Sequence, residues 1–142
     1  MNQNIYDIIV IGGGASGLMA AGRAGEVLKQ SGKGGKVLLL EKNKKLGEKL
    51  KITGGGRCNI TNAECDVREL LKHYGDAGKF LFSLFEKFGV KDTFEFFESR
   101  GLPLVVEERK RAFPASHKAL DVYNVLEKYV KDNGVTIKTS SA

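Results

Sequence analysis

The chain has 142 residues, of which 42% are hydrophobic and 28% charged, as in a soluble globular domain with its own core. Its net charge of +6 fits anionic partners, nucleic acid or cofactor phosphates, and fits an ordinary basic surface equally well. We expect no membrane span and no signal peptide, because no apolar run is long enough and MNQNIYD lacks a basic region. Two cysteines outside any metal-binding spacing favour reduced thiols in a cytoplasmic protein.

The first third of the chain predicts a strand, a helix and a second strand. The apolar run at residues 5–11 ends in glycine, and the glycine-rich turn SGKGGK precedes a second apolar run at residues 37–40. Between them lies a helical pattern with an apolar face that includes Leu18, Ala21, Val27 and Leu28. Because both runs are continuously apolar, we expect strands that are buried on both faces of a parallel sheet, with residues 5–11 at its centre.

The middle of the chain predicts a loop followed by helices. Residues 42–65 are polar and glycine-rich, so we expect a long loop without regular structure. DVRELLKHY, KFLFSLFEKFG and DTFEFFESRG then have helical patterns, and Gly101 ends the third. The apolar face of the second comprises Leu81, Leu84, Phe85 and Phe88. Seven of the eight phenylalanines lie between positions 80 and 97, and we expect them in the core rather than in an aromatic ligand site.

The last third predicts a β-hairpin, a helix and a third strand. LPLVVEE and RKRAFP form the hairpin, and residues 135–138, in the string VTIKT, form a third strand that pairs with the second parallel strand. The helix SHKALDVYNVLEKYVKDNG ends at Gly134 and has an inward face of Ala119, Tyr123, Leu126 and Val130. These elements predict an α/β fold, a Rossmann-like domain with a parallel sheet, a helical segment and a short hairpin.

A GxGxxG pattern follows the first predicted strand and begins the first predicted helix. Gly12 allows the tight turn, Gly14 lets the backbone approach a pyrophosphate, and Gly17 permits close packing of the helix. The N–H groups where the helix begins, at Ala15 and Ser16, face the phosphates. This turn therefore predicts a dinucleotide site.

The same motif predicts an acid at the end of the second strand, where it would bind a ribose hydroxyl. Glu41 stands there, 24 residues after Gly17, and the glycine-rich turn explains the excess over about 20. The alternative is a surface glutamate that merely ends a strand. Together, the glycines and the acid predict an adenine dinucleotide, but their spacing does not distinguish FAD from NAD.

A second glycine triplet, Gly54, Gly55 and Gly56, stands in KITGGGRCNITN. Three missing side chains let a backbone approach a flavin ring or pyrophosphate, and consecutive N–H groups can form an anion-binding nest. Arg57 can contact phosphate bidentately, and Asn59 adds a neutral donor and acceptor. The alternative is a flexible glycine linker.

Cys58, within the same string, has two readings. It could be a redox partner of the flavin or its point of covalent attachment, but we expect a small buried thiol that packs under the loop.

The segments YDIIVIGGGASGLMAA, LLEKNKKLGEKLKITGGGRCNITN and RAFPASHKALDVYNVL resemble the BaiN/RdsA flavoproteins, the aminoacetone-oxidase-like FAD-binding enzymes. The string GGGRCN-TN is the family's hallmark, and the resemblance covers essentially the whole chain. It implies FAD as the cofactor, with Lys42, Arg57 and Asn59 at the FAD. It also implies that residues 1–142 are the N-terminal part of an FAD-binding domain, with the substrate domain and the C-terminal part of the FAD domain absent.

The resemblance implies an FAD-dependent oxidoreductase, with NAD(P)H left open as the reductant. Members of the family are linked to bile-acid intermediates, to aminoacetone and to reduction of a uridine in 23S ribosomal RNA, so the substrate is a small molecule or rRNA. A third possibility is a non-catalytic fragment that binds a dinucleotide. We identify no catalytic residues and no metal site, since His73 and His117 lack partners at ligand spacing and a flavin carries its own chemistry.

We further expect the two glycine triplets to approach two parts of one cofactor. The loop from Gly54 to Asn59 would then fold over the carboxyl ends of the parallel strands, where ligands of open α/β sheets bind.

Overall fold

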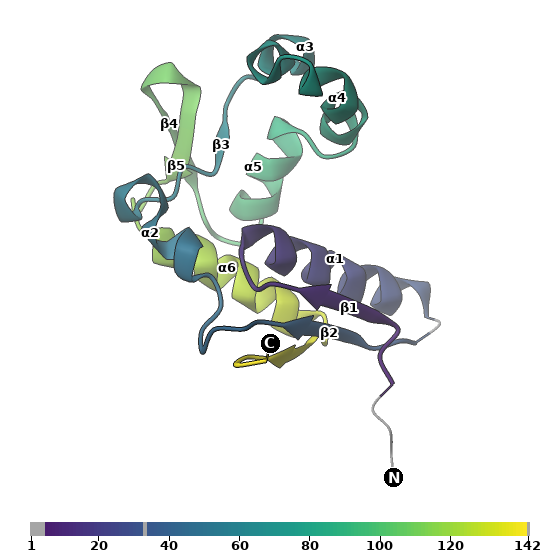
Figure 1. The fold of residues 1–142 in the computed structure, drawn as a ribbon. Helices are drawn as coiled ribbons and strands as arrows, with labels where there is room; N and C mark the ends of the chain where they lie inside the picture. Colours follow the sequence, from purple (N-terminus) through teal and green to yellow (C-terminus); the bar gives the residue numbers. More distant parts are fainter. Residues whose placement is uncertain (1–4, 33, 142) are drawn as a thin grey trace. The chain divides into compact units, whose positions relative to one another are not determined.

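The computed structural model describes residues 5–32 and 34–141 (Figure 1). The N-terminal residues 1–4, Lys33 of the predicted turn and Ala142 lie outside the described residues. The chain divides into two compact units, one of Met1–Ile52 with Tyr123–Ala142 and one of Thr53–Val122. Each unit has its own three-stranded sheet. Among the described residues, no helix is long and apolar enough to cross a membrane.

The first unit contains a parallel sheet. Its strands are β1 (Ile8–Ile11), β2 (Val37–Leu40) and β6 (Thr136–Lys138), in the order β1-β2-β6. Both pairs are parallel, with Ile8 opposite Val37 and Leu38 opposite Thr136. The predicted pairing and order of the three strands are therefore confirmed.

Two helices cover one face of this sheet. α1 (Ala15–Ser31) connects β1 to β2, and α6 (Ala119–Asp132) leads into β6. Connections between parallel strands are right-handed as a rule. The connections from β1 to β2 and from β2 to β6 run in the same direction across the sheet, so both helices lie on the same side of it (Figure 1). The two helices touch, since the Tyr129 hydroxyl donates to Glu26 at 2.8 Å and a Cβ on Gly22 would lie 2.3 Å from the Tyr129 ring.

The apolar faces of these helices are mostly as expected. The predicted inward residues that are buried are Leu18, Ala21, Ala119, Tyr123, Leu126 and Val130. Val27 is exposed, so its place on the buried face was wrong.

The position of the first strand differs from the prediction. Regular structure begins at Ile8, and β1 is an edge strand whose Ile9 and Ile11 side chains are 55% and 85% exposed. The centre of the sheet is β2, where Val37, Leu38 and Leu39 are buried. The apolar run correctly marked a strand, but no described residue pairs with the outer edge of β1.

The second unit contains an antiparallel sheet in the order β3-β5-β4. The expected hairpin is confirmed as β4 (Leu104–Glu107) and β5 (Arg111–Pro114), joined by the short helix η2 (Glu108–Lys110). The strand β3 (Thr61–Asn62) pairs with β5 and was not expected.

The connection between β2 and β3 is more regular than the expected loop at residues 42–65. It contains α2 (Glu48–Gly56), which is helical at first and then kinks where Thr53 has ψ 152° and Gly54 has φ 56°. Leu50 is buried and anchors the helical part. The expectation of a structureless loop was wrong because a short helical segment with a single buried side chain, Leu50, shows no visible periodicity.

The three helices expected after this connection are present in the second unit. They are α3 (Val67–Leu71), continued by the short helix η1 (Lys72–Tyr74), then α4 (Ala77–Lys87) and α5 (Val90–Glu98). The chain leaves the turn after α5 at Gly101, which has the positive φ (81°) of a helix-ending glycine.

The phenylalanines divide between core and surface. Phe96 and Phe97 on α5 are buried, as expected. On α4 and directly after it, however, Phe80 is 75% exposed, and Leu84 and Phe88 are also exposed. The expectation of a phenylalanine core was therefore wrong for Phe80 and Phe88, whereas Leu81 and Phe85 are half-buried and the Phe85 ring lies 6.0 Å from the Tyr74 ring.

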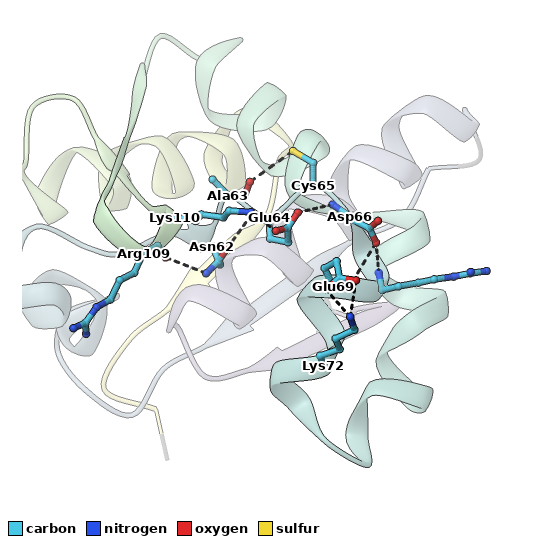
Figure 2. Close-up of polar contacts among 10 residues, drawn as sticks. Asn62, Ala63, Glu64, Cys65, Asp66, Glu69, Lys72, Arg109 and Lys110 are labelled. Carbon is cyan, nitrogen blue, oxygen red and sulfur yellow. Dashed lines mark hydrogen bonds and ion pairs between the residues drawn. The ribbon is translucent and has the colours of Figure 1, made fainter.

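The turn before α3 is held by side-chain hydrogen bonds (Figure 2). Asn62 donates to the carbonyl oxygen of Arg109 at 3.3 Å, and Lys110 pairs with Glu64. That ion pair also lowers the pKa of Glu64. These contacts attach the segment after β3 to the hairpin turn, where both Arg109 and Lys110 have positive φ.

Asp66 caps α3, and this gives a first testable prediction. Its Oδ1 accepts from the N–H groups of Arg68 at 2.8 Å and Glu69 at 3.1 Å (Figure 2). Asp66→Ala leaves both donors without this acceptor and should lower the free energy of unfolding by about 1 kcal/mol. Asp66→Asn keeps an accepting oxygen and is the control. Urea denaturation followed by circular dichroism measures both, and equal stability of the two variants would contradict the capping role.

Candidate functional site

The first glycine turn, residues 12–17, connects β1 to α1. Gly12 has φ 100°, and its N–H donates to the Leu40 carbonyl oxygen at 2.8 Å. A Cβ on Gly17 would lie 1.8 Å from the Gly12 carbonyl oxygen, closer than any real contact. Gly12 therefore makes the tight turn, and Gly17 allows α1 to pack closely on that turn, as the motif predicts.

Gly13, between the motif's first two glycines, is closely packed against the segment that follows β2. A Cβ there would lie 2.3 Å from the side chain of Leu46, and the Gly13 carbonyl oxygen accepts from the Gly47 N–H at 2.8 Å. The segment after β2 thus packs directly on the first glycine turn. The GxGxxG spacing does not predict this role, although a glycine at position 13, which the motif leaves free, is a visible signal.

The N-terminus of α1 is open. Gly14 is its N-cap residue, with φ −79° and no side-chain hydrogen bond, and the first turn of the helix has no acidic residue. A Cβ on Gly14 would meet nothing within 4 Å. The first N–H groups of a helix have no partner within it and carry a partial positive charge. Ala15 and Ser16 stand there, so this end of α1 fits the pyrophosphate of a dinucleotide.

Glu41 ends β2 and is buried, with 8% of its surface exposed. Its Oε2 accepts from the Gly13 N–H at 2.7 Å, and its Oε1 accepts from the Asn43 N–H at 2.8 Å. These backbone hydrogen bonds, Asn43's first, hold the pKa of the Glu41 carboxyl below its usual value. Its backbone is also fixed, because its N–H donates to Lys138 and its carbonyl accepts from Ser141.

The alternative of Glu41 as a surface glutamate is therefore wrong. Each carboxylate oxygen accepts one backbone hydrogen bond, and a carboxylate oxygen has the capacity to accept a second, for example from a ribose hydroxyl. The ribose role stays a prediction. The next residue, Lys42, is exposed, and its charge contributes to the low pKa of Glu41.

The second glycine turn, residues 53–59, lies in the other unit. Gly54, Gly55 and Gly56 have φ of 56°, 66° and 83°, a left-handed conformation that glycine adopts without strain. The Cys58 N–H closes the turn by donating to the Thr53 carbonyl oxygen at 3.0 Å. This is a hydrogen-bonded turn rather than a flexible glycine linker.

The triplet's three glycines have different surroundings. A Cβ on Gly54 would lie 3.0 Å from the Asn59 nitrogen and 3.4 Å from the Phe113 ring, whereas Gly55 and Gly56 face open space. A side chain at the first glycine would therefore be crowded, whereas the other two glycines have room around them.

The polar residues after the triplet also have protein partners. Arg57 Nη1 lies 3.0 Å and 3.1 Å from the two carboxylate oxygens of Glu107. With its amide oriented to donate, Asn59 Nδ2 lies 3.1 Å and 3.2 Å from the carbonyl oxygens of Thr61 and Ala112.

Cys58 is buried, as expected of a packing thiol, and has φ 60°. Burial raises the pKa of its thiol, which keeps the sulfur neutral and unreactive. This favours packing under the loop over a redox or covalent role. Both cysteines are free.

The structure places the predicted site residues in two groups, one in each unit. The expected convergence of the two glycine turns on one cofactor stays a prediction. The two histidines, His73 and His117, are exposed. In the described part of the chain, no three His, Cys, Asp or Glu residues gather in a way that could hold a metal ion.

Comparison with known proteins extends these observations. Residues 6–142 match the family described as the HI0933-like protein Rossmann domain. The chain is 35% identical over 130 residues to the 3-dehydro-bile acid delta(4,6)-reductase of Clostridium scindens, a match that covers 92% of this chain and 30% of the relative. It is 44% identical over 57 residues to the ribosomal RNA dihydrouridine synthase of Escherichia coli K12, covering 40% of this chain and 13% of that protein. The chain thus spans less than a third of the length of either relative.

A solved structure supports the fold. The crystal structure of Thermovibrio ammonificans THI4 superposes with a TM-score of 0.56 and 15% identity, over 94% of this chain and 38% of that one. At this identity the likeness concerns the fold alone, which is Rossmann-like.

Proposed function

The chain belongs to the HI0933-like family through its Rossmann domain, as the resemblance to BaiN/RdsA proteins predicted, and from this membership we propose that it binds the FAD of an oxidoreductase. The observation that carries the proposal is the open N-terminus of α1, where a Cβ on Gly14 would meet nothing within 4 Å. A backbone so exposed fits a pyrophosphate, and FAD contains one.

The first unit would bind the adenosine and pyrophosphate portions of FAD. The N–H groups of Ala15, Ser16 and Gly17 would hold the phosphates, since the α1 dipole favours negative charge there. The Glu41 carboxylate would bind ribose hydroxyls through its remaining acceptor capacity. When bound, the flavin supplies the hydride-transfer chemistry, and the protein supplies orientation and electrostatics.

The second unit would contribute further contacts to the FAD. We propose this for Gly54, Gly55, Gly56, Arg57, Cys58 and Asn59, and for Lys42 in the first unit, on the basis of the family resemblance. The room around Gly55 and Gly56 supports it.

For the whole protein we propose reduction of an organic substrate, with NAD(P)H as the source of electrons. The relatives' names support this direction, since one is a reductase and the other makes dihydrouridine. The substrate class, a small molecule or ribosomal RNA, stays open between these two relatives, and the net charge of +6 is compatible with both.

Titration of the purified chain with FAD tests the binding proposal. Bound flavin changes its visible absorbance and fluorescence, and gel filtration shows whether it migrates with the protein. A chain that binds no FAD at any concentration tested would refute the proposal. Binding without any reduction by NAD(P)H would instead favour a non-catalytic dinucleotide-binding fragment.

The open position at Gly14 gives a second prediction. Gly14→Ala places a methyl group where the pyrophosphate should approach, and we expect the affinity for FAD to fall at least about tenfold. The fold should be unaffected, because φ −79° suits alanine and the Cβ has no neighbour. Flavin fluorescence titration measures the affinity, and thermal unfolding controls for folding. Unchanged affinity in a folded variant would place the phosphates elsewhere.

A further inference from the structure

The Arg57 guanidinium is fixed from two directions within the second unit. Its Nη1 lies 3.0 Å and 3.1 Å from the two carboxylate oxygens of Glu107, and its guanidinium carbon lies 4.3 Å from the centre of the Phe113 ring. Phe113 is itself buried, so the ring is a rigid support. An arginine that stacks on a ring and pairs at one nitrogen has lost most of its rotational freedom.

Glu107 is the centre of this arrangement. It ends β4 and stands opposite Arg111 in the hairpin, with Arg111 Nη2 at 4.0 Å and His117 Nδ1 at 3.6 Å from its carboxylate oxygens. Three side chains that carry or can carry positive charge thus converge on one carboxylate. Arg57 has the shortest and the only doubly hydrogen-bonded contact among them.

The pairing leaves part of the guanidinium available. Among the described residues, the hydrogen bonds of the Arg57 side chain all come from Nη1, and the side chain is 39% exposed. The Nε–Nη2 edge therefore remains for another acceptor. Arg57 is itself part of the second glycine turn, where its N–H donates to the Gly54 carbonyl oxygen.

We propose that Glu107 is a positioning residue for the cofactor: it holds Arg57 so that the Nε–Nη2 edge of the guanidinium hydrogen-bonds to FAD. This inference rests on the proposed function. Arg57 and Arg111 together outweigh the single charge of Glu107, so the cluster keeps a net positive charge. The acceptor is therefore an oxygen of FAD, on the flavin ring or on a phosphate, and the test below distinguishes the two.

The test is a double-mutant cycle on the full chain, with FAD affinity as the measured quantity. Glu107→Gln should weaken FAD binding about fivefold, because Arg57 must then be ordered on binding. In an Arg57→Gln background the same change should have no effect, since no guanidinium remains to be positioned. Glu108→Gln removes the same charge from the neighbouring exposed residue and should leave the affinity unchanged.

Riboflavin, which has no phosphate, identifies the portion of the cofactor that Arg57 contacts. Arg57→Gln should weaken riboflavin and FAD by the same factor if the guanidinium binds the flavin portion. A loss confined to FAD would place the guanidinium at a phosphate instead. Two outcomes would overturn the positioning role alone. One is that Glu107→Gln still weakens FAD binding in the Arg57→Gln background, and the other is that the Glu107→Gln and Glu108→Gln variants bind FAD with equal affinity. Failure of the unsubstituted chain to bind either compound would overturn the proposed function and this inference with it.

Discussion

Gly17→Ala should destabilise the chain by about 3 kcal/mol, the upper part of the range for overpacked substitutions. The added Cβ would lie 1.8 Å from the Gly12 carbonyl oxygen, which is backbone and cannot rotate away. This steric clash is relieved only if α1 moves away from the turn, and that movement would break the contacts of α1 with β1 and β2. Urea denaturation followed by circular dichroism measures the loss.

Gly14→Ala is the matched control, because it adds the same methyl group three residues earlier. Its Cβ meets nothing within 4 Å, so its stability should stay within about 0.5 kcal/mol of the unsubstituted chain. The two variants therefore separate the roles of the motif's glycines, with Gly17 serving the fold and Gly14 the ligand. Equal stability of both variants would show that the first glycine turn relaxes far more readily than its geometry indicates.

Glu41→Gln should remove about 3 kcal/mol of stability at pH 7. The Gln side chain presents an NH₂ group where one carboxylate oxygen now accepts, so one of the two backbone donors, Gly13 or Asn43, loses its partner. Hydrogen bonds to charged groups contribute about 1.5–3 kcal/mol each, and a buried donor left unpaired adds its own cost. Glu86→Gln, at an exposed position of α4, controls for the loss of one negative charge.

The pH dependence has a definite sign. The folded chain lowers the pKa of Glu41 below its ordinary 4.5, so the ionised carboxylate is the form that stabilises the fold. That contribution is fully present above pH 4.5 and is lost as the pH falls through the lower, folded-state pKa. The stability difference between Glu41→Gln and the unsubstituted chain should therefore be largest at neutral pH and shrink in acid. A difference that stays constant from pH 7 to pH 3 would contradict the role of the charge.

The same variant tests the ribose role at a pH where it remains folded. A fall in FAD affinity beyond that of Glu86→Gln would support contact between Glu41 and the cofactor. Unchanged affinity would leave Glu41 as a residue that only fixes the first glycine turn.

The elements that the sequence predicted best are those with strong local signals. The continuous apolar run of β2, the helical pattern of α1 and the glycines between β1 and α1 each reflect short-range geometry, and all three were located correctly. The same holds for Glu41, whose place at the end of β2 follows from the motif's spacing. Its partners, Gly13 and Asn43, follow from the packing of the segment after β2 on the turn, which no short-range pattern encodes.

The errors have different physical causes. β3 has two residues, and it is a strand only because Thr61 pairs with Ala112, far along the chain. The edge position of β1 depends on which strands pair with it, and apolarity alone cannot show that. The helical pattern of α4 shows that its apolar residues share one face, but it does not show whether another element covers that face, and Phe80 and Phe82 are exposed. The pairing of Arg57 with Glu107 likewise joins residues brought together only by the hairpin.

The backbone bonds that fix Glu41 also bear on how the chain is made. Its N–H and carbonyl groups pair with Lys138 and Ser141, so the acid at the end of β2 is completed by a segment that leaves the ribosome much later. At about 5–20 residues per second, the 97 residues from Glu41 to Lys138 take roughly 5 to 20 seconds to synthesise. During that interval β2 has no β6 beside it. A nascent chain stalled before Lys138 should therefore hold β1, α1 and β2 without a finished nucleotide site.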